Sequence, residues 1–142
     1  MKLMIILIVF ALFFTYSTLL NAQLFIQGDT YAAGNKPHGI IAVDLDGDTD
    51  LDLAVTSGYS DSISILKNNG NGTFQTAVKY KSSWYPYDIF AEDLDGDNDI
   101  DLVATNRDYY ANRVSVFINN GDGTFPNIPK YYQTGFKPIA VF

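Results

Sequence analysis

Short hydrophobic runs separated by turn-forming residues dominate the chain after its first 22 positions. The run Ser62–Ile65 alternates polar and apolar residues, as does the run Arg113–Ile118, and each alternation predicts a half-buried β-strand. Further short apolar runs cover residues 40–43, 53–56, 89–91 and 139–142. We find no convincing helical period in this part of the chain. The pattern therefore predicts an all-β protein built from short strands.

Three markers recur along the chain and define a repeat. An acidic run that begins at Asp44 returns at Asp93, and the turn Asn68–Phe74 returns as Asn119–Phe125. Since Asn and Gly tolerate positive φ, these turns predict tight hairpins. The third marker is a spaced Phe, Tyr and Pro, found at Phe25, Tyr31 and Pro37, at Phe74, Tyr80 and Pro86, and at Phe125, Tyr132 and Pro138.

The phase of these markers divides the chain into units of about four strands. Two units are complete, over residues 37–85 and 86–137. Residues 23–36 are expected to form the outer strand of a partial unit, and residues 138–142 to start a third repeat inside its first strand. An opening strand without its partners suits a β-propeller, in which it completes the last blade and closes the ring. We therefore expect four-stranded antiparallel propeller blades, two complete and one partial at each end, from a longer protein.

The N-terminus has the composition of an export signal over residues 1–22. Lys2 precedes a continuous apolar run from Leu3 to Phe14, and Ala22 closes a plausible cleavage site. The apolar run is shorter than the roughly 20 residues of a membrane-spanning helix, although an uncleaved anchor stays open. The chain has no cysteine. We expect a secreted or cell-surface protein, periplasmic or extracellular, with no membrane insertion after cleavage.

Charge is concentrated in the two acidic runs. The chain has 16 Asp and Glu residues and a formal net charge of −7, and ten of the acids lie in these runs. The rest of the sequence is slightly basic but shows no basic stripe, so a nucleic-acid partner is not expected. His38 is the only histidine, which argues against a zinc site. No catalytic constellation is evident, and we expect no enzymatic activity.

Each acidic run places a carboxylate at every second position. The ten carboxylates are Asp44, Asp46, Asp48, Asp50 and Asp52 in the first run and Asp93, Asp95, Asp97, Asp99 and Asp101 in the second. Such a cluster repels itself unless a cation neutralises it, and calcium prefers six to eight oxygen ligands. An EF-hand is excluded because its position twelve, normally Glu, is Val55 or Ala104. The runs thus predict two calcium sites, against the alternative of a merely solvated acidic loop.

These motifs resemble the FG-GAP-like (VCBS-type) repeat family. The matching pieces are Asn-Asn-Gly-Asp-Gly-Thr-Phe, the proline that follows it, and Asp-Leu-Asp-Gly-Asp-x-Asp-x-Asp-Leu. The family is similar to the blades of integrin α-subunit propellers, which carry calcium between the first and second strands. The resemblance implies side-chain ligands at Asp44, Asp46 and Asp48, a backbone carbonyl ligand at Asp50, and a closing carboxylate at Asp52. The second loop follows the same scheme, from Asp93 to Asp101.

One departure from the family affects the first loop. The family often has glycine at position six, where this chain has Thr49 and Asn98. Asn tolerates left-handed φ, whereas β-branched Thr does so poorly. If that position requires positive φ, the first site is strained and weaker than the second.

The resemblance implies a binding or adhesion module that recognises a surface glycan or an extracellular protein. The alternatives are the non-catalytic propeller portion of a larger secreted enzyme, such as a hydrolase or lyase, and a structural spacer. The aromatic segment Trp84–Tyr87 could contact a ligand or pack between blades. Whether calcium would be structural or would lie in the binding site also stays open at this point.

Overall fold

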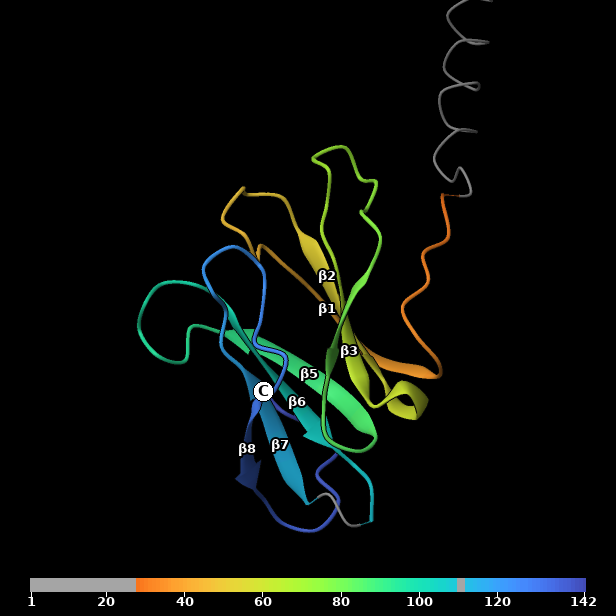
Figure 1. The fold of residues 1–142 in the computed structure, drawn as a ribbon, viewed down its shortest axis with the longest axis vertical. Coiled ribbons are helices and arrows are strands. Elements are labelled where there is room, and N and C mark those ends of the chain that lie inside the picture. The colour runs from red at the N-terminus through yellow and green to blue at the C-terminus, as the bar shows by residue number, and fades with distance from the viewer. Residues whose placement is uncertain (1–27, 110–111) are drawn as a thin grey trace, which may run out of the picture. The chain divides into compact units, whose positions relative to one another are not determined.

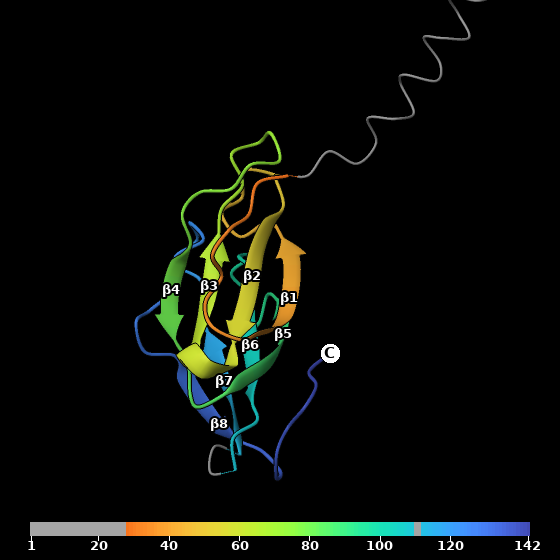
Figure 2. The ribbon, with the colours of Figure 1, turned by 90° about the vertical axis from the view of Figure 1, so that its right-hand side faces the viewer.

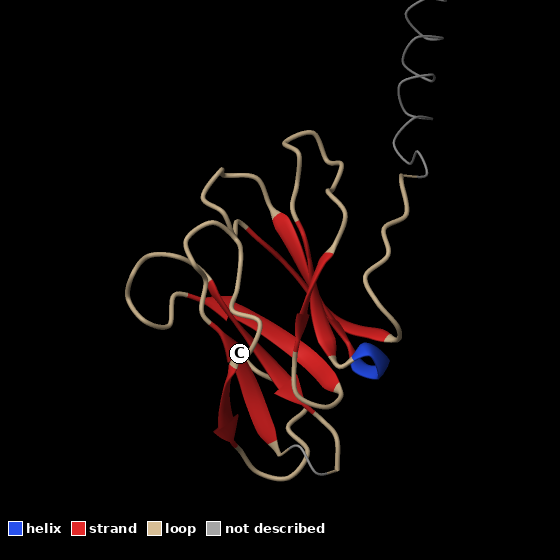
Figure 3. Ribbon diagram, in the orientation of Figure 1, coloured by secondary structure: helices blue, strands red, loops and turns tan. Residues whose placement is uncertain are grey.

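Two four-stranded antiparallel sheets make up the fold in the computed structural model, which describes residues 28–109 and 112–142 (Figure 1). A single turn of 3₁₀-helix, Gly58–Ser60, is the one helical element of these residues (Figure 3). The prediction of an all-β protein is therefore confirmed. The strands are β1 (Pro37–Val43), β2 (Asp52–Ser57), β3 (Ser62–Leu66) and β4 (Val78–Lys81), then β5 (Pro86–Glu92), β6 (Asp101–Asn106), β7 (Arg113–Phe117) and β8 (Lys130–Gln133).

Each sheet is a meander in which every strand pairs with the next one along the chain. The orders are β1-β2-β3-β4 and β5-β6-β7-β8, and Figure 2 shows the first sheet with its strands side by side. Equivalent strands share a register, since Ile41 pairs with Ala54 where Phe90 pairs with Val103. Both first strands also carry an irregularity just after their opening proline. We call the two sheets the first and second blade, because their topology is that of propeller blades.

The hydrophobic core lies between the two blades. β5 packs against β1 and β2, and side chains of both sheets form one buried cluster. The cluster includes Leu45, Ala54 and Ile63 from the first blade and Leu102 and Phe117 from the second. Because a single sheet cannot bury its hydrophobic face alone, the repeats stabilise one another by stacking.

The recurring Phe and Tyr of the third sequence marker contact each other between successive repeats. The rings of Tyr80 and Phe125 lie edge to face with their centroids 5.5 Å apart. Tyr31 and Phe74 repeat this arrangement at 5.4 Å, and the backbone N–H of Phe74 donates to the Tyr31 hydroxyl at 3.0 Å. Such aromatic pairs add to the stabilisation that burial gives. The marker thus encodes the contact between one unit and the next.

The central strand β3 is more buried than its alternation predicted. We expected it to be half-buried, but all five residues of Ser62–Leu66 are buried. The segment before β1 covers the serine side, where the Ser64 hydroxyl donates to the Ala33 carbonyl at 2.9 Å. Ser57 donates to the same carbonyl at 2.6 Å. Ser64 of β3 therefore faces a hydrogen-bonding chain segment and not water.

Two expected end strands are not formed in the described residues. Residues 28–36 contain no strand, although an outer strand was expected over 23–36, of which 23–27 lie outside the described residues. No strand of the described residues pairs with this segment, whose Ala33 carbonyl instead accepts from the hydroxyls of Ser57 in β2 and Ser64 in β3. Residues 138–142 also form no strand.

The expected export signal over residues 1–22 lies outside the described residues. Within residues 28–109 and 112–142, no helix has the length and apolar character needed to cross a membrane.

Candidate metal centres

The two acidic runs form the loops that join the first and second strand of each blade, β1 to β2 and β5 to β6. Their first carboxylates fold both loops in the same way. Asp44 accepts hydrogen bonds from the backbone of Gly47 at 2.8 Å and of Thr49 at 2.9 Å. Asp93 accepts from Gly96 at 2.7 Å and from Asn98 at 3.0 Å. Two loops of similar sequence therefore have one geometry, as the repeat predicts.

Both loops turn through two residues in the left-handed region. Gly47 has φ of 77° and Gly96 has φ of 85°, as their role in a tight turn requires. At position six, Thr49 has φ of 75° and Asn98 has φ of 73°. Position six therefore has positive φ, which is the condition under which we expected the first loop to be strained. A β-branched residue is a genuine outlier in this region, whereas Asn is several-fold enriched there.

Carboxylate oxygens converge in each loop. In the first loop, Asp44, Asp46 and Asp48 each place an oxygen within 4.8 Å of the others. In the second loop the converging group is Asp93, Asp95 and Asp101. The predicted residues are thus brought together in part, and the two groups differ in membership.

The last carboxylate of each run connects its loop to the Asn-Gly turn of the same blade. Asp52 is fully buried, and it accepts from the backbone of Leu45 at 3.2 Å and of Asn68 at 2.8 Å. Asp101, also fully buried, accepts from Leu94 at 3.1 Å and from Asn119 at 2.8 Å. Hydrogen bonds of this kind, from backbone N–H to a carboxylate, are among the stronger ones. Sequence reasoning gave these residues a role in closing a metal shell but missed this connection.

The remaining predicted positions have local roles. Asp48 accepts from the backbone of Asp50, and Asp97 from that of Asp99, both at 2.9 Å. The carboxylate of Asp50 lies beside the turn, so close to Gly70 that an added Cβ there would be 2.8 Å from an Asp50 oxygen. Asp99 and Gly121 repeat this close approach. Gly70 and Gly121 also have φ of 78° and 86°, and the positive φ together with the close carboxylate favours glycine at these turn positions.

Desolvation, with a smaller contribution from neighbouring like charges, raises the pKa of one acid in each loop. The pKa of Asp95 is raised by desolvation first and then by the charges of Asp97, Asp101 and Asp93. Desolvation also raises the pKa of Asp52, against the effect of its two backbone hydrogen bonds. A cation placed among such carboxylates would reverse this repulsion.

A lysine lies beside the first loop but has no counterpart at the second. The Lys67 ammonium is 3.1 Å from Oδ2 of Asp46, and it also donates to the carbonyl of Asp122 in the second blade. The equivalent position of the second repeat is Ile118. The other oxygen of Asp46, Oδ1, is buried and has no hydrogen-bond partner among the described residues. Lys67 thus neutralises part of the first cluster while one carboxylate oxygen remains available to a cation.

Asn119 connects the two loops across the blades. Its side-chain amide donates to the carbonyl of Leu45 in the first loop at 2.8 Å and to that of Ile100 in the second at 3.0 Å. Its amide oxygen accepts from Gly121 and Gly123 within its own turn. The sequence marked Asn119 as part of a turn, but only the fold reveals that it holds both acidic loops.

The donor set fits a hard divalent cation. It consists of carboxylates, without the thiolates and imidazoles that select zinc or copper. The unpartnered buried oxygen of Asp46 and the convergence of three carboxylates in each loop agree with such an ion. The arrangement can bind a cation but contains no evident nucleophile and base pair.

Comparison with known protein families gives a match to the family described as FG-GAP-like repeat. It covers residues 44–104 and 93–141, which together span most of the 142-residue chain. Each match begins at an acidic loop. No curated protein and no solved structure matches the chain.

Proposed function

Because the chain belongs to the FG-GAP-like repeat family, we propose that it is an exported, calcium-binding module that recognises a surface glycan or an extracellular protein. Repeats of this family suggest a propeller-like binding module, are typically extracellular and are generally non-catalytic. We propose three further properties of this chain: that it binds calcium, that it is exported, and that its partner is a surface glycan or an extracellular protein.

One observation carries the calcium proposal. Two loops that share a carboxylate pattern also share a backbone geometry, and each gathers carboxylate oxygens within 4.8 Å of one another. Charges held this close are costly unless a cation offsets them. Asp44, Asp46 and Asp48 would hold the ion in the first loop.

In the second loop Asp93, Asp95 and Asp101 would hold the ion. When bound, the ion supplies positive charge and oxygen coordination, which draws each loop into one conformation. The fold then transmits this order, because Asp101 bonds to the backbone of Asn119 and the Asn119 amide bonds to both loops. We therefore assign calcium a structural role, in which it stiffens the junction between the blades.

Calcium titration by isothermal calorimetry tests the proposal. We expect two sites, and the variant Asp93→Asn should lose the second site while it keeps the first. Asp29→Asn, which removes an exposed acid outside both loops, is the matched control and should keep both sites. Absence of calcium binding to the folded protein would refute the proposal, as would loss of a site in the control.

A further inference from the structure

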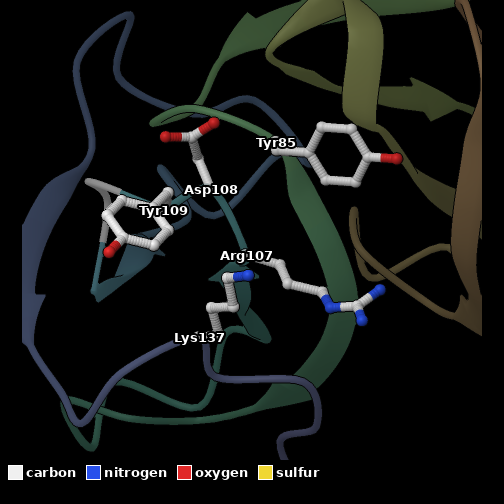
Figure 4. Close-up of a pocket in the computed structure, with 5 residues that line it drawn as sticks. All are labelled: Tyr85, Arg107, Asp108, Tyr109 and Lys137. Atoms are coloured by element: carbon white, nitrogen blue, oxygen red, sulfur yellow. The ribbon is translucent and has the colours of Figure 1, made fainter.

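Two pockets of similar size and chemistry adjoin the connection between the blades. The first has a volume of about 250 Å³ and is lined by Tyr85, Arg107, Asp108, Tyr109 and Lys137 (Figure 4). The second has a volume of about 250 Å³ and is lined by Lys81, Ser82, Ser83, Trp84, Arg113 and Tyr131. Each lining combines two aromatic rings with two basic side chains, and Asp108 is the one acid among these residues.

Both pockets share one short chain segment. Trp84 lines the second pocket and Tyr85 the first, and these residues are consecutive in the connection from β4 to β5. The Trp84 ring is 56% exposed, so its face is available to a ligand. Since consecutive Cα atoms are about 3.8 Å apart, a chain-like ligand that fills one pocket passes close to the other.

The pockets lie at the opposite end of the blades from the acidic loops. Those loops join the first to the second strand of each antiparallel meander, whereas Arg107 follows β6, Arg113 begins β7 and Lys81 ends β4. In an antiparallel sheet, such alternate connections lie at opposite ends. The acidic charge of the loops is therefore kept away from the basic pockets.

Three strained backbone positions place long side chains at this end. Lys36, Tyr85 and Lys137 each precede a proline and have φ of 56°, 54° and 51°. Glycine or asparagine adopts this region at the lowest cost, yet the chain carries two lysines and a tyrosine there. Two of them line the first pocket, and the ammonium of Lys36 lies 5.4 Å from the centre of the Tyr85 ring. Strain of this kind tends to gather at binding sites.

Aromatic rings hold the basic groups in place. The guanidinium of Arg107 lies 4.7 Å from the centre of the Tyr87 ring, and that of Arg113 lies 5.5 Å from the centre of the Tyr131 ring. A guanidinium stacked in this way keeps N–H donors at its edge, where they suit a carboxylate. The charges of Lys36 and Arg107, after desolvation, also lower the pKa of nearby His38, in agreement with a positive local field.

This set of groups selects one class of ligand. Basic groups bind an anion, aromatic faces stack on the apolar face of a sugar ring, and the Asp108 carboxylate adds an acceptor for hydroxyl groups. Each pocket is smaller than the roughly 300–1,000 Å³ of typical small-molecule sites, so it suits a single sugar residue. The repetition of the same chemistry in two adjoining pockets suits a polymer that carries one charge per residue.

We propose that the two pockets together bind a polysaccharide of uronic acid residues, with a carboxylate at the basic groups of each pocket and a sugar face against its aromatic rings. This inference rests on the proposed function, that the protein is a binding module, and it names the class of ligand that the module binds. It does not require calcium, because the loops lie at the other end of the blades.

Binding of a short oligogalacturonide, measured by calorimetry at fixed calcium, tests the inference. Its methyl ester is the neutral control with the same sugar rings, and a short oligoglutamate is the polyanion without them. Arg107→Gln and Lys137→Gln remove charge from the first pocket, and Arg113→Gln removes it from the second. Lys130→Gln is the matched control, because Lys130 is exposed on β8 and alternates in direction with Tyr131.

We expect the oligogalacturonide to bind, the methyl ester and the oligoglutamate to bind at least about tenfold more weakly, and each pocket variant to lose about tenfold in affinity. Lys130→Gln should change affinity less than twofold. Equal binding of the methyl ester, unchanged affinity in the three pocket variants, or no binding at all would overturn the inference. Equal binding of the oligoglutamate would also overturn it and indicate an acidic protein partner.

The calcium response of the same preparation separates this inference from the proposed function. A protein that binds calcium but no oligogalacturonide contradicts only the ligand assignment. A protein that binds the oligogalacturonide without a calcium response contradicts only the metal assignment.

Discussion

Exchange of the residues at position six of the two loops tests the geometric basis of the sites. Thr49 and Asn98 have φ of 75° and 73°, and both donate their backbone N–H to the first carboxylate of their loop. Both side chains are exposed, so the exchange removes little packing. The left-handed region costs a typical L-residue roughly 1–2 kcal/mol, more if it is β-branched and less for Asn. Thr49→Asn should therefore stabilise the fold by about 1 kcal/mol, and Asn98→Thr should destabilise it by about as much.

Thermal unfolding followed by circular dichroism, in chelator, measures this effect without a contribution from bound ions. A change of about 1 kcal/mol corresponds to a shift in midpoint of about 4–8 °C for a domain of 60–100 residues, and somewhat less for a larger one. Thr49→Asn should raise the midpoint, Asn98→Thr should lower it, and the double exchange should return it close to that of the parent. The reasoning is refuted if both single variants shift the midpoint in the same direction.

Three single substitutions test individual contacts in the two blades. Lys67→Met removes an ammonium group next to the first loop and should tighten calcium binding there several-fold in a calcium titration. Unchanged or weaker affinity would contradict the idea that the Lys67 ammonium competes with calcium for Asp46. Asn119→Ala should cost at least about 2 kcal/mol in urea unfolding, because it removes one hydrogen bond to the first blade, at Leu45, and one to the second loop, at Ile100. Asn120→Ala at an exposed turn position should cost under about 1 kcal/mol, and equal losses in the two variants would argue that Asn119 does not link the loops. Arg107→Gln should raise the pKa of His38 towards its ordinary value in an NMR titration, and a further fall would contradict the proposed positive field at His38. Because the pKa of His38 is lowered in the folded protein, the stability that His38 contributes is present above its ordinary pKa and is lost as the pH falls through the folded value.

Local pattern predicted the strands and loops well, because their causes are local. The alternation in β3 and β7, the Asn-Gly turns and the need for positive φ at Gly47 follow from residues close together in the chain. The left-handed conformation at Thr49 was considered only as a condition, based on the glycine that the resembled family often has at position six, and the structure meets this condition.

Contacts between distant segments could not be predicted in the same way. The burial of the serine side of β3 depends on Ala33, which lies far from that strand in sequence. The Asn119 bridge and the Lys67 ion pair depend on how one blade stacks on the next. The same stacking explains why Leu45 is buried in the core while its counterpart Leu94 is 45% exposed.

Thermal unfolding of the parent and of an Asp46→Asn/Asp95→Asn variant, in millimolar calcium and in chelator, tests the central claim most directly. A site filled at a hundred times its dissociation constant stabilises a fold by about 2.7 kcal/mol. We predict that calcium raises the midpoint of the parent and that the variant loses most of this rise. A folded parent whose midpoint is the same with and without calcium would contradict the account.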